Sequence, residues 1–364
     1  MNNMQSAESK RIEYFDAMRI ICMLGVIVIH VVGHHVDGKP VGAVWHTANL
    51  LEGFARFSVP VFMMITGALL LKTDSSLSLK TVYLKRMPRV LVPAFVWACI
   101  YAVLICTQKF SAPFDCEKLK NILSDIWATP VYEHLWYVYA LVAFYILLPI
   151  LRLLIKNCSM NFIGYCLLIW FAASCVLPTL SSINGIFKVT PDADLNVRSG
   201  YIGLFVLGYY LDNLKIKLKP GYLAAAFIAA SLGTAVLSFY YLKARGDALR
   251  PFYEYFSPNV VVSSAAAFLL LKAVLSEKPA IKNNKHIIIS LSNAVFGVYL
   301  CHEFFRTLLY ELLRGLNPFA EMAVSFIVTV AVSFAFSLIC SKIKYICYVF
   351  TGNKNPAALK LRER

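Results

Sequence analysis

The chain has 364 residues, of which 59% are hydrophobic and only 15% are charged. A soluble domain usually carries about 25% charged residues, so this composition argues against a soluble protein. The formal net charge of +15 does not indicate a nucleic-acid partner, because the basic residues concentrate in loops on one side of the predicted membrane spans.

Apolar runs of about 18 to 25 residues recur along the chain, and a helix of that length crosses the hydrocarbon core of a bilayer. These runs lack the alternation of polar and apolar residues that is typical of membrane barrels. We therefore predict an all-α, polytopic integral membrane protein with about ten transmembrane helices, forming a single membrane domain over residues 1–364. In chain order, the predicted spans are Phe15–Val36, Phe54–Leu71, Leu84–Cys106, Leu135–Ile155, Phe162–Leu180, Gly200–Leu211, Tyr222–Leu242, Val260–Leu275, Ile287–Leu309 and Met322–Phe350.

The distribution of basic residues predicts the orientation of these spans. More than half of the 35 Lys and Arg lie at the N-terminus or in loops that share its side of the membrane. Cytoplasmic loops carry this excess, so we expect both ends in the cytoplasm, as a segment over residues 1–14 and a basic tail over residues 351–364. Within the first span no small-residue cleavage site follows Val32, since Gly33-His34-His35 comes next. We therefore expect it to remain as an uncleaved helix.

Three ionisable residues lie within the first span, where such groups are costly and usually functional. Arg19 and His30 are separated by about three helical turns, so they share a face about 16 Å apart along the axis. Asp16 lies three residues before Arg19 and is close enough to pair with it. An ordinary alternative has Arg19 reaching the cytoplasmic interface and His30 hydrogen-bonded to a neighbouring helix.

Three further pairs of candidate residues, and Ser58, lie in or next to later spans. Arg86 and Arg89 begin the third span, His134 and Trp136 introduce the fourth, and His302 and Glu303 lie in the ninth. Each has an ordinary explanation as a helix-end anchor, an interfacial aromatic residue or a satisfied interior histidine. Ser58 opens a Ser-Val-Pro-Val-Phe segment in the second span.

Taken in order, these segments resemble the membrane acyltransferases often called acyltransferase family 3. The resemblance covers nearly the whole chain, and the sequence looks most like the enterobacterial common antigen O-acetyltransferases within the family. Thr66 departs from the Ser that is more usual there. The resemblance is carried by Arg19-x10-His30, Ser58-Val-Pro-Val-Phe…Thr66-Gly67, Arg86-x-x-Arg89, His134-Leu-Trp136 and Gly297-Val-Tyr…His302.

The resemblance implies an O-acyltransferase of the bacterial inner membrane that modifies a polysaccharide. It would move an acyl group, commonly acetyl from cytoplasmic acetyl-CoA, to a hydroxyl of a cell-surface or lipid-linked carbohydrate, with no metal. The implied partners are acyl-CoA, the glycan acceptor and the lipid bilayer. The implied catalytic residues are His30, Arg19 and Glu303, although the sequence leaves open whether Glu303 or Asp16 orients the catalytic group. The donor phosphates would be bound by Arg19, Arg86 and Arg89. The acceptor would be bound by His134, Trp136, His302 and Ser58.

Two other classes of protein share a bundle of this size. A secondary transporter or a flippase for lipid-linked sugars would also have a polar centre, but such proteins often contain internal repeats. No similarity between the two halves is evident, and Pro60, Pro88 and Pro93 have no counterparts in the second half. A membrane sensor without catalysis would leave the Arg19–His30 spacing and the Arg86–Arg89 pair unexplained.

Overall fold

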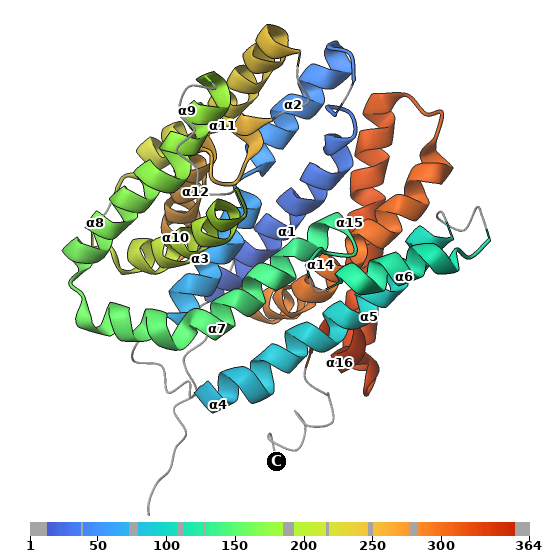
Figure 1. Ribbon diagram of the computed structural model, residues 1–364, viewed down its shortest axis with the longest axis horizontal. Helices are drawn as coiled ribbons and strands as arrows, with labels where there is room; N and C mark the ends of the chain where they lie inside the picture. Colours follow the sequence, from blue (N-terminus) through green and yellow to red (C-terminus); the bar gives the residue numbers. More distant parts are fainter. Residues whose placement is uncertain are drawn as a thin grey trace, which may run out of the picture. The chain divides into compact units, whose positions relative to one another are not determined.

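The computed structural model describes residues 13–37, 39–72, 79–107, 113–126, 128–184, 193–215, 218–246, 250–276 and 283–353. Within these ranges the chain is helical and contains no strand (Figure 1). Most of the predicted cytoplasmic segments at the two ends lie outside the described residues. The helices of eight or more residues are α1 (Glu13–Gly33), α2 (Ala43–Ala55), α3 (Ser58–Leu70), α5 (Met87–Cys106), α6 (Cys116–Asp125), α7 (Trp136–Asn157), α8 (Met160–Trp170), α9 (Leu177–Asn184), α10 (Ala193–Asn213), α11 (Pro220–Arg245), α12 (Pro258–Leu275), α14 (Lys285–Leu313) and α15 (Pro318–Lys342).

Shorter helical pieces extend or introduce these helices. Proline at the first turn begins α11, α12 and α15, where its missing N–H has no helical partner to lose. A π-helical turn precedes α5 and another joins α8 to α9, and such turns often occur at functional sites. The short pieces are α4 (Leu79–Thr81), η1 (Val82–Arg86), η2 (Glu133–Leu135), η3 (Phe171–Val176), η4 (Pro251–Tyr253) and α16 (Ile346–Thr351).

Nine helical stretches of the described chain are long and apolar enough to cross a membrane, judged by length and composition. Nine of the ten predicted spans overlap them. Large apolar side chains on these helices are exposed, including Leu153 at 64% and Leu168 at 69%. Exposed apolar surface on this scale is unfavourable in water but compatible with lipid. The prediction of an all-α, multi-pass membrane protein is confirmed.

Two predicted spans have the wrong boundaries. The second predicted span began at Phe54, but the helical stretch begins at Ala43 with α2. Asn49 and Glu52 interrupt the apolar run in this part, and the structure buries both. The tenth predicted span ran to Phe350, but α15 ends at Lys342. Tyr345 adopts a positive φ of 68°, which a right-handed helix cannot accommodate, so α16 forms a separate short helix.

Helix α6 is an element that hydropathy did not predict, because the segment is polar and lies between the third and fourth predicted spans. Its helical start follows from local chemistry, since the Asp115 side chain accepts a hydrogen bond from the backbone N–H of Lys118 at 2.9 Å. This is a helix N-cap. None of its residues is buried, so it is a surface helix.

The described chain divides into two compact units, each assembled from three segments. Unit 1 comprises Met1–Cys22, Glu52–Val82 and Leu147–Ile289, and unit 2 comprises Met23–Leu51, Tyr83–Ile146 and Ser290–Arg364. The prediction of one domain over residues 1–364 stays a prediction.

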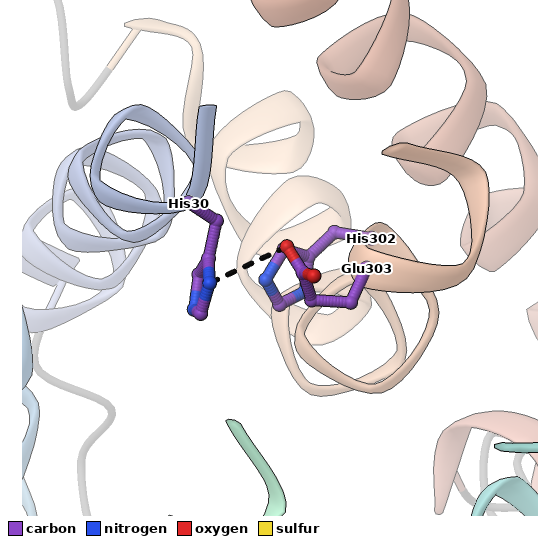
Figure 2. A group of neighbouring side chains, drawn as sticks. All are labelled: His30, His302 and Glu303. Carbon is purple, nitrogen blue, oxygen red and sulfur yellow. Dashed lines mark ion pairs between the residues drawn. The ribbon is translucent and has the colours of Figure 1, made fainter. Parts of the chain in front are cut away.

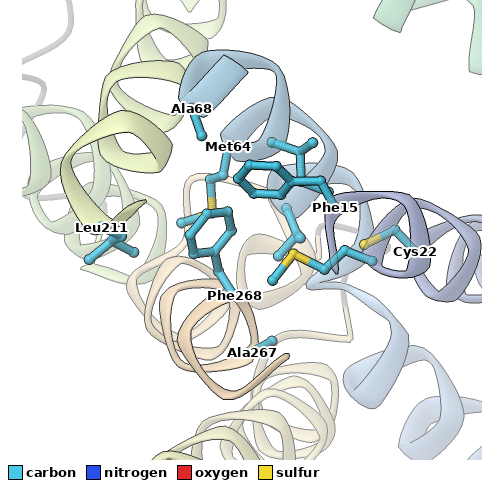
Figure 3. Packing of buried hydrophobic residues seen from close by; sticks show 10 residues of the cluster. Phe15, Cys22, Met64, Ala68, Leu211, Ala267 and Phe268 are labelled. Atoms are coloured by element: carbon cyan, nitrogen blue, oxygen red, sulfur yellow. The ribbon is translucent and has the colours of Figure 1, made fainter. Parts of the chain in front are cut away.

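The core of unit 1 joins α1, α3, α10 and α12 (Figure 3). Phe15 and Phe268 pack with ring centroids 6.1 Å apart, and the sulfur-containing side chains of Met18, Met64 and Cys22 fill the space around them. Methionine suits irregular gaps of this kind because it is unbranched and flexible.

Helix α10 contains the predicted Gly200–Leu211 span but is not among the nine apolar stretches. Close packing against α3 accounts for its place in unit 1. A Cβ added at Gly67 would collide with the backbone carbonyl of Phe205, and one added at Gly208 would collide with the backbone of Met64. Small residues let two membrane helices approach closely. These glycines therefore allow α10 to pack directly against the backbone of α3.

Unit 2 contains the second half of α1, most of α2 and α14, the first half of α7, and all of α5, α6, α15 and α16. The buried Tyr101 of α5 donates to the carbonyl of Leu300 at 2.8 Å and accepts from the N–H of Phe304 at 3.1 Å. Trp97 donates to the carbonyl of Phe350 at 3.1 Å. These bonds hold α14 and α16 against α5. Because Leu300 and Phe304 flank His302 and Glu303, the bonds also fix the position of these two polar residues relative to α5.

Candidate active site

Four polar side chains from three separate segments of unit 2 meet around α14. His30 comes from the last turn of α1, His302 and Glu303 come from the middle of α14, and His134 comes from the short helix η2 that introduces α7. We call these four residues the His30 cluster. The sequence predicted a site role for each of them, and the structure brings them together.

A chain of ion pairs runs through this cluster. The Nδ1 atom of His30 lies 3.3 Å from a carboxylate oxygen of Glu303 (Figure 2). Arg306, one turn further along α14, donates two hydrogen bonds to the same carboxylate. Its Nε lies 2.7 Å from one oxygen and a terminal nitrogen lies 2.9 Å from the other. Glu303 is 2% exposed, so its charge is balanced by the guanidinium rather than by water.

The sequence left open whether Glu303 or Asp16 orients the catalytic group. Asp16 pairs with Arg19 at 3.2 Å, as the three-residue spacing predicted. Glu303 is the carboxylate that lies against His30, and it is therefore the group placed to orient that ring.

His302 is fully buried, and its hydrogen bonds indicate its tautomer. Its Nδ1 atom faces the backbone carbonyls of Tyr299 at 2.7 Å and Val298 at 3.2 Å. A carbonyl oxygen only accepts, so Nδ1 carries the proton and Nε2 keeps its lone pair. Nε2 makes no hydrogen bond within the described residues, and the ring centroid lies 5.1 Å from that of His30. His302 therefore presents a basic nitrogen next to His30.

His134 is also buried, at 3% exposure. Its ring lies edge-on to His302, with centroids 5.1 Å apart, and 6.2 Å from the ring of His30. The ring faces the backbone carbonyl of Leu300, but neither nitrogen makes a well-formed hydrogen bond within the described residues. Buried polar atoms are nearly always paired, so the His134 ring retains hydrogen-bonding capacity for a bound group.

Aromatic side chains complete one side of the cluster. Tyr101 stacks on Tyr132 with centroids 4.5 Å apart and meets His134 edge-on at 5.1 Å. The Tyr132 hydroxyl lies 3.1 Å from the hydroxyl of Thr307. Burial raises the pKa of the Tyr132 phenol, so this group stays protonated at neutral pH.

Sequence reasoning missed Arg306, Tyr101 and Tyr132. Arg306 lies three residues after Glu303 on one helix, and that spacing alone predicts a pair. The two tyrosines carry no comparable signal, because their place beside His134 depends on how α5 packs against α14.

The pairing of Glu303 bears on whether the cluster holds a metal. Ligand atoms of His30, His302 and Glu303 all lie within 4.8 Å of one another. Arg306 already occupies both carboxylate oxygens, and a guanidinium repels a nearby cation. The arrangement favours proton transfer over metal binding. A histidine whose Nδ1 is held by a carboxylate acts as a general base through Nε2 in known hydrolases.

The remaining predicted residues lie elsewhere. Arg86 ends the π-helical turn before α5, where it interacts electrostatically with Arg89; both belong to unit 2. Trp136 begins α7 in the same unit, with its ring edge-on to Tyr137. Arg19 and Ser58 belong to unit 1, where Arg19 pairs with Asp16 and Ser58 is fully buried at the start of α3.

Comparisons with known proteins identify the family to which the chain belongs. No curated protein and no solved structure showed a match to this sequence. A family model described as an acyltransferase domain matches residues 12–338. That range covers nearly the whole chain and includes every residue of the His30 cluster. The chain therefore belongs to acyltransferase family 3 and is a multi-pass membrane acyltransferase.

Proposed function

We propose that this acyltransferase moves an acetyl group from cytoplasmic acetyl-CoA to a hydroxyl of a cell-surface or lipid-linked carbohydrate, with His30 as general base. The contact between His30 Nδ1 and the Glu303 carboxylate carries the proposal. It leaves Nε2 as the base, and Glu303 stabilises the imidazolium that forms when the base takes a proton.

The reaction is a direct transfer. The acceptor hydroxyl gives its proton to Nε2 of His30 as its oxygen bonds to the thioester carbonyl carbon. The tetrahedral intermediate collapses with cleavage of the C–S bond, and the departing CoA sulfur takes the proton from His30. The products are an acetyl ester and free CoA. A covalent acyl-histidine at His30 would give the same products in two steps, and acid quenching of a donor-only incubation distinguishes the routes.

Arg86 and Arg89 are proposed to bind the phosphates of the donor. Two like charges lie close enough to repel each other, and within the described residues neither forms an ion pair with a carboxylate. A dianionic phosphate would relieve this repulsion, and arginine binds phosphate with two parallel hydrogen bonds. By the predicted orientation these residues face the cytoplasm, which holds acetyl-CoA.

The acceptor side is proposed to include His302, His134 and Trp136. The lone pair on His302 Nε2 suits a sugar hydroxyl that donates a hydrogen bond. Trp136 is partly exposed at the start of α7 and suits stacking on a sugar ring. The resemblance to the enterobacterial common antigen O-acetyltransferases makes a surface glycan of a bacterial inner-membrane pathway the expected acceptor.

The experiment compares glycans from a deletion strain with those from strains complemented by wild type or by Glu303→Gln, using mass spectrometry. We expect the acetyl mass to be absent from the deletion strain, restored by wild type and largely absent with Glu303→Gln. A flippase would instead alter the amount of surface glycan without changing its acetylation. Unchanged acetylation in the deletion strain contradicts the proposed function.

A further inference from the structure

A second cluster of histidine and carboxylate side chains lies in unit 2, separate from the His30 cluster. His34 and His35 are adjacent in the turn that follows α1, and Glu321 lies in the first turn of α15. None of these three residues has a part in the proposed transfer. We call them the His34 cluster.

The ligand atoms of this cluster converge. His34 Nε2 lies 3.3 Å from one oxygen of Glu321, and His35 Nε2 lies 2.8 Å from the other. The centroids of the two imidazole rings are 3.9 Å apart, with the ring planes tilted by 40°. One ligand atom from each of the three residues lies within 4.8 Å of the others. In a tetrahedral zinc site with bonds of about 2.0–2.1 Å, ligand atoms are about 3.3 Å apart. The observed separations bracket that value.

Hydrogen bonding within the cluster is incomplete. Although His35 Nε2 lies 2.8 Å from a Glu321 oxygen, neither this nitrogen nor the Glu321 oxygen that faces His34 forms a hydrogen bond of good geometry within the described residues, despite their burial. His34 Nε2 has only a long contact of 3.5 Å to the other Glu321 oxygen. Buried polar atoms of this kind normally have partners. Two imidazole nitrogens and a carboxylate that point at one another without good hydrogen bonds are what a shared cation would satisfy.

The surroundings also suit a cation. His34 is 28% exposed on its side chain, which leaves room for water at a further position. The ring of Tyr310 meets His34 edge-on at 5.3 Å and restrains its orientation. Arg306 is near enough to act on His34 electrostatically, but its charge is neutralised by the two-point contact with Glu303.

We propose that His34, His35 and Glu321 bind a divalent transition-metal ion, with zinc as the best fit. Two imidazoles and one carboxylate form a common zinc ligand set that leaves a fourth position open to water. The bound ion would link the end of α1 to the start of α15. Because His34 follows His30 by one helical turn, a metal here restrains the end of the helix that carries the proposed base. The metal is a positioning element and takes no part in the chemical step.

The test measures metal binding to the purified full-length protein in detergent. The protein is stripped with a chelator, loaded with Zn²⁺ or Co²⁺, passed through a desalting column and analysed for metal content. We expect one ion per chain for wild type and a visible absorption band of tetrahedral type with Co²⁺. Loss of an outer-shell partner alone weakens metal sites about 10- to 100-fold, so Glu321→Gln, which removes a direct ligand, should weaken binding at least tenfold.

Matched variants separate this site from other histidines. His35→Gln should weaken binding as Glu321→Gln does, which provides a second substitution if one variant folds poorly. His46→Ala removes an exposed histidine of α2 and should leave binding unchanged. Melting temperatures measured in chelator report whether each variant is folded, and added zinc should raise that of wild type but not that of Glu321→Gln.

Two results would overturn the proposal. One is the absence of stoichiometric metal in folded wild-type protein. The other is metal that persists in Glu321→Gln and His35→Gln but disappears in Glu303→Gln, which would place the ion in the His30 cluster. Neither result bears on acetyl transfer, so the proposed function is tested separately.

Discussion

Two buried carboxylates of this protein are each held by arginine, yet their surroundings differ. In unit 1, Glu52 is 1% exposed and binds Arg56 at 2.7 Å through one oxygen and Arg250 at 2.5 Å through the other. Both guanidinium groups also lie over the ring of Tyr253, at 5.1 Å and 4.2 Å from its centroid. In unit 2, Glu303 binds one arginine and one histidine.

The difference lies in which groups can change protonation. Arginine does not lose its proton at physiological pH, so the ion pairs around Glu52 are permanent and suited to holding helices together. Histidine changes its charge near neutral pH, and the ring of His302 next to His30 keeps a lone pair. Burial and ion pairing are therefore common to both regions, and the presence of a titratable partner separates a proposed reaction site from a structural one.

The largest effect on turnover is expected at His30. Replacing a general base typically costs about 10²- to 10⁴-fold in rate, so His30→Ala should lower acetyl transfer by that factor while the melting temperature and donor binding stay close to wild type. The measurement is steady-state transfer by the purified variant. His286→Ala, which removes an exposed histidine of α14, serves as the control and should behave as wild type.

His30→Gln sharpens this test, because glutamine can keep a hydrogen bond to Glu303 but cannot act as the base. Near wild-type transfer by His30→Gln would assign His30 a structural role like that of the Glu52 pairs. The base would then be another group, with His302 as the next candidate.

The largest effect on stability is expected at Glu52. Breaking a buried ion pair from one side costs about 3–5 kcal/mol, and partial exposure of the Arg56 and Arg250 side chains, at 14% and 21%, places Glu52→Gln toward the lower end. Thermal unfolding in detergent should show a clear loss of stability, with transfer per folded molecule nearly unchanged. The control is Glu311→Gln, whose partner Arg314 is exposed, with an expected change within about 0.5 kcal/mol. Loss of transfer by folded Glu52→Gln would contradict the structural role.

Arg306 should have an intermediate effect, because it acts on the base only through Glu303. A hydrogen bond to a charged group contributes about 1.5–3 kcal/mol, so Arg306→Ala should lower turnover about 10- to 100-fold. Arg306→Lys should recover only part, since lysine cannot reproduce the two-point contact. Arg314→Lys is the matched exposed control. Equal losses for Arg306→Lys and His30→Ala would mean that the guanidinium has a direct part in the reaction.

The smallest effect is expected at the donor site. Arg86→Ala or Arg89→Ala should weaken acetyl-CoA binding about tenfold each, with the turnover at saturating donor little changed. Isothermal titration in detergent measures the affinity. Lys85→Ala, an exposed neighbouring cation, is the control. Wild-type affinity in the double Arg86→Ala, Arg89→Ala variant would reduce this pair to helix-end anchors.

Local properties of the sequence were sufficient for most of the fold. Hydropathy predicted ten spans, and nine of them overlap the long apolar helical stretches of the described chain, because a lipid-exposed helix must be apolar along its length. Packing decided what hydropathy did not. Helix α2 carries the buried Asn49 and Glu52, and α10 packs closely on α3 through Gly67 and Gly208. Helix α15 ends at Lys342, ahead of the positive φ of Tyr345.

The candidate site shows the same division. Ionisable residues within apolar runs indicated His30, His302 and Glu303 from the sequence, because the bilayer makes such groups costly unless they have a function, and the family resemblance added His134. The Asp16–Arg19 pair followed from helical spacing alone. The pairing of His30 with Glu303, the tautomer of His302 and the convergence of His34, His35 and Glu321 were decided only by the tertiary structure. Periodicity places a residue on a helix face, but which faces meet depends on packing between helices that are distant in the chain.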